Sequence, residues 1–145
     1  MKPIVTWIVL ANSRMAKICE NRGPEKGLVA VEGRHWHAAA VSEPRDKAGR
    51  GHSIAGPGVA AVEQTDPQLR SDIRFARDVS EHLLHDFSAK GFDRLIIVAG
   101  PHMLGLLREH LDDRLQAVTV GEIAKDLTAQ PLAALEGHIG EVIAV

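Results

Sequence analysis

The sequence predicts an α/β domain in which an antiparallel β-meander leads into a long helix and then into alternating strands and helices on a mixed sheet. Two observations predict this. The first part of the chain contains short runs rich in β-branched residues separated by turn residues, and the second part has apolar residues at helical spacing. With 145 residues, 45% apolar and 25% charged, the chain is the size of a single domain, residues 1–145.

Three strands are predicted in the first part. Residues 3–11 form a β-branched run that ends at Asn12, a residue typical of turns. Residues 15–20 and 27–33 follow as shorter strands, and the segment NRGPEKG between them is rich in turn residues. We therefore expect these strands to pair as an antiparallel meander.

A long helix is predicted next. Thr65 or Asp66 is its N-cap, Pro67 occupies its first turn, and Gly91 ends it. The helix is about 24 residues long, which is within the range of globular proteins. Its apolar face is formed by Leu69, Ile73, Ala76, Leu83 and Phe87.

The rest of the chain alternates between strands and helices. Residues 94–99, RLIIVA, form a continuous apolar run that indicates a central strand buried on both faces. The other predicted elements are a helix at 101–111, a strand at 116–120, and short helices at 121–128 and 131–136. This order is that of ribonuclease H-like folds, so we expect a three-layer fold of that class.

Composition excludes several classes of protein. The net charge of −2 provides no global positive field, so any anion site must be local. The only cysteine, Cys19, cannot form a disulfide framework, which favours a cytoplasmic location. No run of about 18 apolar residues is present, and the N-terminal apolar run lacks a signal-peptide cleavage pattern. We expect a soluble cytoplasmic protein with no membrane partner.

A glycine-rich, mildly basic segment, residues 43–58 (the basic loop), precedes the long helix. It starts like a Walker A motif, but Pro57 and Gly58 replace the lysine and the hydroxyl residue, so no nucleotide cofactor is predicted. Its glycines permit close approach to another polymer, whereas the alternative is a simple surface connector. The candidate nucleic-acid-binding residues of this loop are Arg45, Lys47, Gly49, Arg50, Gly51 and His52.

Three arginines at helical spacing, Arg70, Arg74 and Arg77, form the arginine stripe on the long helix. A phosphate backbone could bind along this stripe. The alternative is a solvated, salt-bridged face, because each arginine lies four residues from an acid. These acids are Asp66, Asp78 and Glu81.

Other candidate sites carry weaker signals. The first strand has no acidic residue, which disfavours two-metal nuclease chemistry. His35 and His37 should project to one side of a strand, but neither they nor the pair His82 and His85 have an obvious third ligand, so no metal site is predicted. The turn at Gly100 and His102 opens a helix and is a candidate anion site; the alternative is an ordinary strand-to-helix turn.

Four segments carry a resemblance to a known family. In order, TWIVLANSRMAKICEN, IRFARDVSEHL, FDRLIIVAGPHMLGLLREHL and EIAKDLT resemble the bacterial family named "protein required for attachment to host cells". That family is grouped with bacterial relatives of archaeal and eukaryotic peptide-chain release factors. The resemblance implies a core similar to the release-factor middle domain, in which a basic glycine-rich loop carries Gly-Gly-Gln. Here Gly51, His52 and Ser53 stand at that place and the glutamine is absent, which argues against peptidyl-tRNA hydrolysis.

Together, charge and resemblance predict a non-catalytic binding protein that engages the ribosome or tRNA through the basic loop and the arginine stripe. No catalytic residue and no cofactor are predicted. One alternative is a small hydrolase acting on RNA or an ester with His52 or His102 as base. Another is a protein-interaction module that influences attachment to host cells indirectly, through a protein partner that the sequence does not identify.

Overall fold

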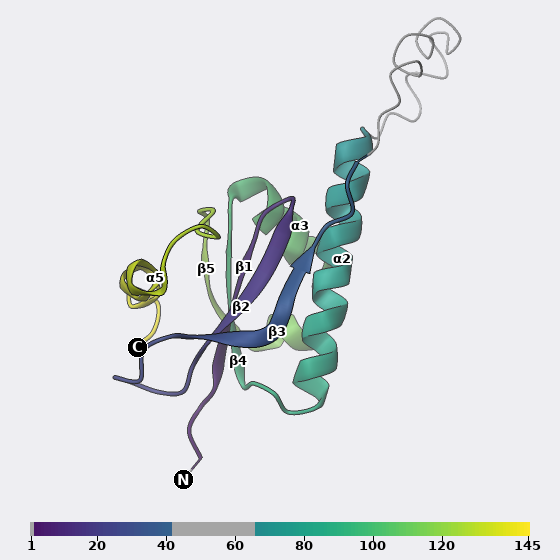
Figure 1. The fold of residues 1–145 in the computed structure, drawn as a ribbon. Helices are drawn as coiled ribbons and strands as arrows, with labels where there is room; N and C mark the ends of the chain where they lie inside the picture. The colour runs from purple at the N-terminus through teal and green to yellow at the C-terminus, as the bar shows by residue number, and fades with distance from the viewer. Residues whose placement is uncertain (1, 42–65) are drawn as a thin grey trace, which may run out of the picture.

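The computed structural model describes residues 2–41 and 66–145 (Figure 1). These residues contain a five-stranded sheet in the order β3-β2-β1-β4-β5. The strands are β1 (Thr6–Ala11), β2 (Met15–Asn21), β3 (Val29–His37), β4 (Arg94–Ala99) and β5 (Thr119–Ile123). The helices are α2 (Pro67–Ser88), α3 (Pro101–His110), α4 (Asp113–Ala117) and α5 (Leu132–Ile139).

The sheet is mixed, as predicted. Strands β1, β2 and β3 pair antiparallel, whereas β4 pairs parallel with both β1 and β5. In the parallel register Ala11 lies opposite Ala99, so the residues that follow them, Asn12 and Gly100, emerge at the same edge of the sheet. Ligands of open α/β sheets often bind at this carboxyl edge.

Side chains of the central strands alternate between two cores. Trp7 and Val9 of β1 face the core beneath α2, α3 and α4, while Ile8 and Leu10 face the core beneath α5. All four side chains are buried. Because helices cover both faces of the sheet (Figure 1), the fold has three layers, and the predicted fold class is confirmed.

Helix α2 begins and ends where local signals place it. The Asp66 carboxylate accepts a hydrogen bond from the Gln68 backbone N–H at 3.0 Å, and Pro67 is the first helical residue. The chain leaves the helix at Lys90, whose φ is +64°, and Gly91 follows. The predicted long helix is confirmed, with Asp66 as its N-cap.

Strand β3 runs further than the predicted segment 27–33 and contains a bulge. Its pairing with β2 jumps from Cys19–Ala30 to Lys17–His35, so several residues of β3 face a single residue of β2. Such a bulge interrupts the ladder of an edge strand, which discourages edge-to-edge association.

The predictions for residues 116–128 were partly wrong. The segment 113–117 is helix α4, the strand begins at Thr119, and no helix covers residues 121–128. The strand forms here because it pairs in parallel with β4, with Ile96 opposite Gly121 and Val98 opposite Ile123. Tertiary pairing therefore overrides the helical spacing of the local sequence. Within the described ranges, no helix is both long and apolar enough to cross a membrane.

Candidate nucleic-acid interface

The six candidates in the basic loop lie outside the described residues. These are Arg45, Lys47, Gly49, Arg50, Gly51 and His52. The structure does place the chain on either side of residues 42–65. Residues 38–41 and the first turns of α2 form the two walls of one groove of about 230 Å³, which we call the arginine groove. The described segments that precede and follow the loop in the sequence therefore both line the arginine groove.

Two residues of the arginine stripe, Arg70 and Arg74, line the arginine groove. Arg77 lies beside them on the same helix, and all three side chains are exposed. The opposite face of α2 is buried, with Ala76 and Val79 fully covered by the core. The arginine stripe therefore lies on the solvent-facing side of a helix whose other side is packed in the core.

Two of the ion pairs expected from the spacing are absent. Within residues 2–41 and 66–145, no salt bridge joins Arg74 to Asp78 or Arg77 to Glu81. Four other arginines do bind carboxylates. Their pairs are Arg22–Glu20, Arg34–Asp86, Arg108–Glu122 and Arg114–Asp112. The salt-bridged face that the spacing suggested is therefore wrong for Arg74 and Arg77.

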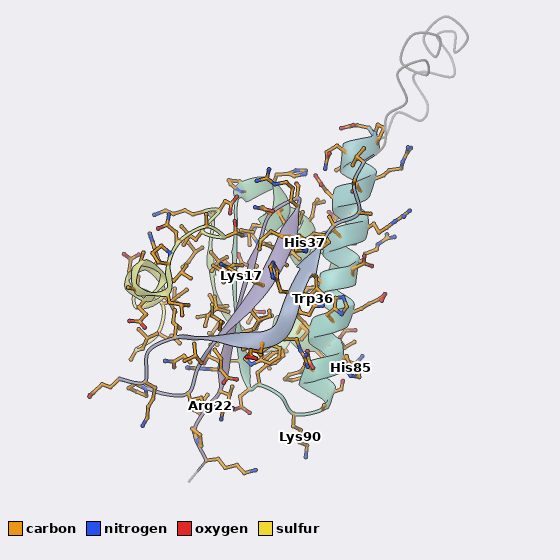
Figure 2. All side chains as sticks on the ribbon, viewed as in Figure 1. Lys17, Arg22, Trp36, His37, His85 and Lys90 are labelled. Carbon is orange, nitrogen blue, oxygen red and sulfur yellow. The ribbon has the colours of Figure 1, made fainter. Side chains whose placement is uncertain are left out.

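A second groove of about 430 Å³ adjoins the first at Asp78, which lines both. We call it the tryptophan groove. Trp36 of β3 lies between this strand and α2 (Figure 2), and its ring stacks on the His82 ring at 4.4 Å between centroids with an angle of 7°. Sequence reasoning missed this contact, because Trp36 and His82 belong to elements far apart in the chain.

The two predicted histidine pairs differ in how their rings are arranged. His35 and His37 lie on one side of β3, as predicted, with ring centroids 4.7 Å apart. His82 stacks on Trp36 instead of joining His85 in a ligand pair. The described part of the chain contains no group of three or more histidine, cysteine, aspartate or glutamate residues that could hold a metal ion.

The turn at Gly100 opens α3 with Pro101 as the first helical residue, and none of the described side chains caps the helix. His102 Nε2 lies 2.9 Å from Asp72 Oδ2, and Gln68 Nε2 donates to Asp72 Oδ1 at 2.8 Å. Asp72 is only 2% exposed, so its carboxylate is a buried group on α2 that orients the exposed His102. The sequence did contain a signal for this burial. Asp72 is three residues after Leu69 and four before Ala76, which places it on the apolar face of the helix.

At the end of β1, Asn12 joins three separate segments. Its Oδ1 accepts hydrogen bonds from the backbone of Arg14 and Met15, and its Nδ2 donates to Asp126 and Thr128. Burial raises the pKa of Asp126, but hydrogen bonds from Thr128 and Asn12 and the charge of Arg14 together outweigh burial and lower it. This edge therefore holds a hydrogen-bonded cluster whose side chains already have partners.

Comparison with solved structures supports the fold. The chain is similar to a structure described as an archaeal protein, with 14% identity and a TM-score of 0.51. It is also similar to an archaeal translation termination factor, with 12% identity and a TM-score of 0.52. Each match covers 97% of this chain and 35% of the other, so this chain spans about a third of those proteins. At this identity the likeness shows the fold alone.

Comparison with families identifies the chain more directly. A search of curated proteins found no match. The model of one family, described as protein required for attachment to host cells, matches residues 7–139 and so includes every described strand except the first residue of β1. The chain therefore belongs to the family of proteins required for attachment to host cells.

Proposed function

We propose that this protein is a non-catalytic RNA-binding protein that associates with the ribosome or with tRNA. The observation that carries the proposal is the pair Arg74 and Arg77, which are exposed on α2 and have no ion pair with the acids one turn away among the described residues. Arg70 and Arg74 also line the arginine groove, whose other wall is formed by residues 38–41.

A phosphate backbone is the ligand that this surface suits best. Arginine presents a fixed fork of donors to phosphate, and an arginine that holds no carboxylate does not have to break an ion pair to bind. Because α2 is packed against the sheet, its arginines remain at helical spacing without ordering a flexible segment. Affinity should therefore depend on salt.

The role of the basic loop is proposed from its sequence, and the choice of partner is proposed from a structural neighbour. Arg45, Lys47 and Arg50 would add backbone contacts, and Gly49 and Gly51 would allow close approach, as their sequence suggests. One structural neighbour is a translation termination factor, which makes the ribosome and tRNA the first partners to test.

Ribosome co-sedimentation and tRNA anisotropy across a salt series test this proposal. We expect binding at low salt that weakens as salt rises, and a salt slope about one unit smaller for each of Arg50→Ala, Arg74→Ala and Arg77→Ala. Arg114→Ala is the matched control, because that exposed arginine already binds Asp112. Absence of binding at low salt, or an equal loss in the control, would overturn the proposal. Salt-insensitive, nuclease-resistant capture of a protein would favour an interaction module instead.

One observation favours a hydrolase as the second candidate function. An ionised Asp72 only accepts hydrogen bonds, so it holds the N–H of His102 at Nε2 and leaves Nδ1 as the free basic atom of a neutral ring. No hydroxyl or thiol of the described residues hydrogen-bonds to His102, so water would be the nucleophile. Cleavage of a labelled RNA or an aryl ester that is lost in His102→Gln and retained in His110→Gln would support this candidate.

A further inference from the structure

We propose that the tryptophan groove binds an unpaired base of the RNA, which stacks on the His82 ring and donates its exocyclic amino group to Asp78 or Glu81. This inference rests on the proposed RNA-binding function and specifies which part of the RNA the protein reads. The groove is lined by side chains from β3 and α2, including Trp36, His82, Asp78 and Glu81.

The stack of Trp36 and His82 provides the platform. Trp36 is half-buried and packs against the core, while the His82 ring lies parallel to it and is exposed. A ring that is backed by a second ring keeps its orientation, so its outer face is available without prior ordering. Unpaired bases bind proteins chiefly by stacking on such faces.

The charges of the groove suit the edge of a base and repel phosphate. Arg34 donates to both carboxylate oxygens of Asp86, at 2.7 and 2.8 Å, so these two charges offset one another. Asp78 and Glu81 remain, and neither forms an ion pair with the arginine one turn away within the described ranges. Carboxylates accept hydrogen bonds from amino groups such as N4 of cytosine. Uracil has no exocyclic amino group to donate.

The two grooves together fit one short single strand. Arg74 and His82 are eight positions apart on α2, which corresponds to about 12 Å along the helix axis. The arginine groove is thus the phosphate end and the tryptophan groove the base end, with Asp78 lining both. A duplex keeps its bases stacked internally, so it cannot occupy the base end.

Tryptophan fluorescence of the whole protein tests this inference. The chain has two tryptophans, and Trp7 is 4% exposed and stacked on Phe92, so changes on binding report on Trp36. The probes are unstructured oligo(C) and oligo(U) of equal length and a mixed-sequence RNA duplex. We expect fluorescence changes and tighter binding with oligo(C), weaker binding with oligo(U), and no fluorescence change with the duplex.

Variants separate the base end from the phosphate end. His82→Ala should weaken oligo(C) binding by at least about fivefold, the scale of one lost base stack. His110→Ala, on α3 and outside the groove, is the matched control. Asp78→Asn and Glu81→Gln together should reduce the preference for oligo(C) over oligo(U). All the substituted side chains in the groove are exposed, so the variants should keep the fold.

The failure of this inference differs from the failure of the proposed function. If RNA binds with salt dependence and Arg74→Ala weakens it, but His82→Ala and the tryptophan signal do not respond, the base site is wrong and the RNA-binding function stands. Equal affinity for oligo(C) and oligo(U) would also overturn the base site. If the protein binds no ribosomes, no tRNA and no oligonucleotide at low salt, both proposals fall.

Discussion

His102 Nε2 of α3 lies 2.9 Å from Asp72 Oδ2 of α2, and this contact joins the first turn of α3 to the second turn of α2 on one face of the sheet. Asp72 has a second partner in Gln68, one turn earlier on its own helix. The Asp72 carboxylate is buried, so the free-energy cost of burying it is offset by these two contacts. The pair is therefore a point where the stability of the domain can be tested.

We expect His102→Ala to lower the free energy of unfolding by about 1–3 kcal/mol, because Asp72 then loses a partner while it stays buried. Urea unfolding followed by circular dichroism measures this change. His110→Ala removes a histidine from the same helix without touching Asp72 and should change stability far less. Equal effects of the two substitutions would show that the contact contributes nothing.

Gly121 of β5 is a second test of packing. A Cβ atom at this position would clash with Val142 Cγ1, so Gly121→Ala should lower the free energy of unfolding by about 1–3 kcal/mol. Adding Val142→Ala should recover part of the loss. Gly105 is the control, because a Cβ there meets no atom within 4 Å, and Gly105→Ala in α3 should raise stability by about 0.5–1 kcal/mol. Thermal unfolding of these three variants measures the effects.

Asp126 should make stability depend on pH. Its pKa is lowered in the folded protein because hydrogen bonds from Thr128 and Asn12 and the charge of Arg14 outweigh the opposing effect of burial. A lowered folded pKa adds stability above the unfolded pKa, and that stability is lost as pH falls through the folded pKa.

The role of Thr128 in this shift can be measured by NMR titration of the Asp126 carboxyl carbon. Thr128→Val removes the hydroxyl that donates to Asp126 at 2.7 Å, so the pKa should rise toward its ordinary value. Thr128→Ser keeps a hydroxyl and should preserve the lowered pKa. An unchanged pKa in Thr128→Val would mean that other contacts dominate.

Cys19 should be unreactive in the native protein. The side chain is 2% exposed, and burial raises the pKa of the thiol, although the charge of Lys17 partly opposes this. Thiolate is the reactive species, so labelling by a disulfide reagent should be slow in buffer and fast in urea. Because the chain has one cysteine, the labelling rate also reports opening of the fold, and Gly121→Ala should increase it. Rapid native labelling would contradict the buried position.

The parts of the fold that were predicted correctly have strong local signals. The strand at 94–99 is a continuous apolar run, and its bounds match β4. Helix α2 has an acidic N-cap, a proline in its first turn and an apolar face, so its start needs no information from elsewhere. Strand β5 has weaker signals and forms through pairing with β4, which local periodicity does not show.

The site was predicted less completely. The spacing of Arg70, Arg74 and Arg77 placed them on one helix, and their exposure agrees with a surface stripe. The same spacing suggested ion pairs of Arg74 and Arg77 with the acids one turn away, and these ion pairs do not form among the described residues. Side chains four residues apart on a helix are near enough to pair, but exposed pairs gain so little free energy that spacing does not guarantee the contact.

By itself, the sequence determined the order of strands and helices as far as the first turns of α3, and the absence of an acidic residue on the first strand, because hydrophobic periodicity and residue identity are local properties. Only the tertiary structure decided which side chains meet. The contacts Trp36–His82 and Asp72–His102 each join two elements across the packed face of the sheet. Their partners are selected by strand pairing and helix packing, which depend on the whole chain.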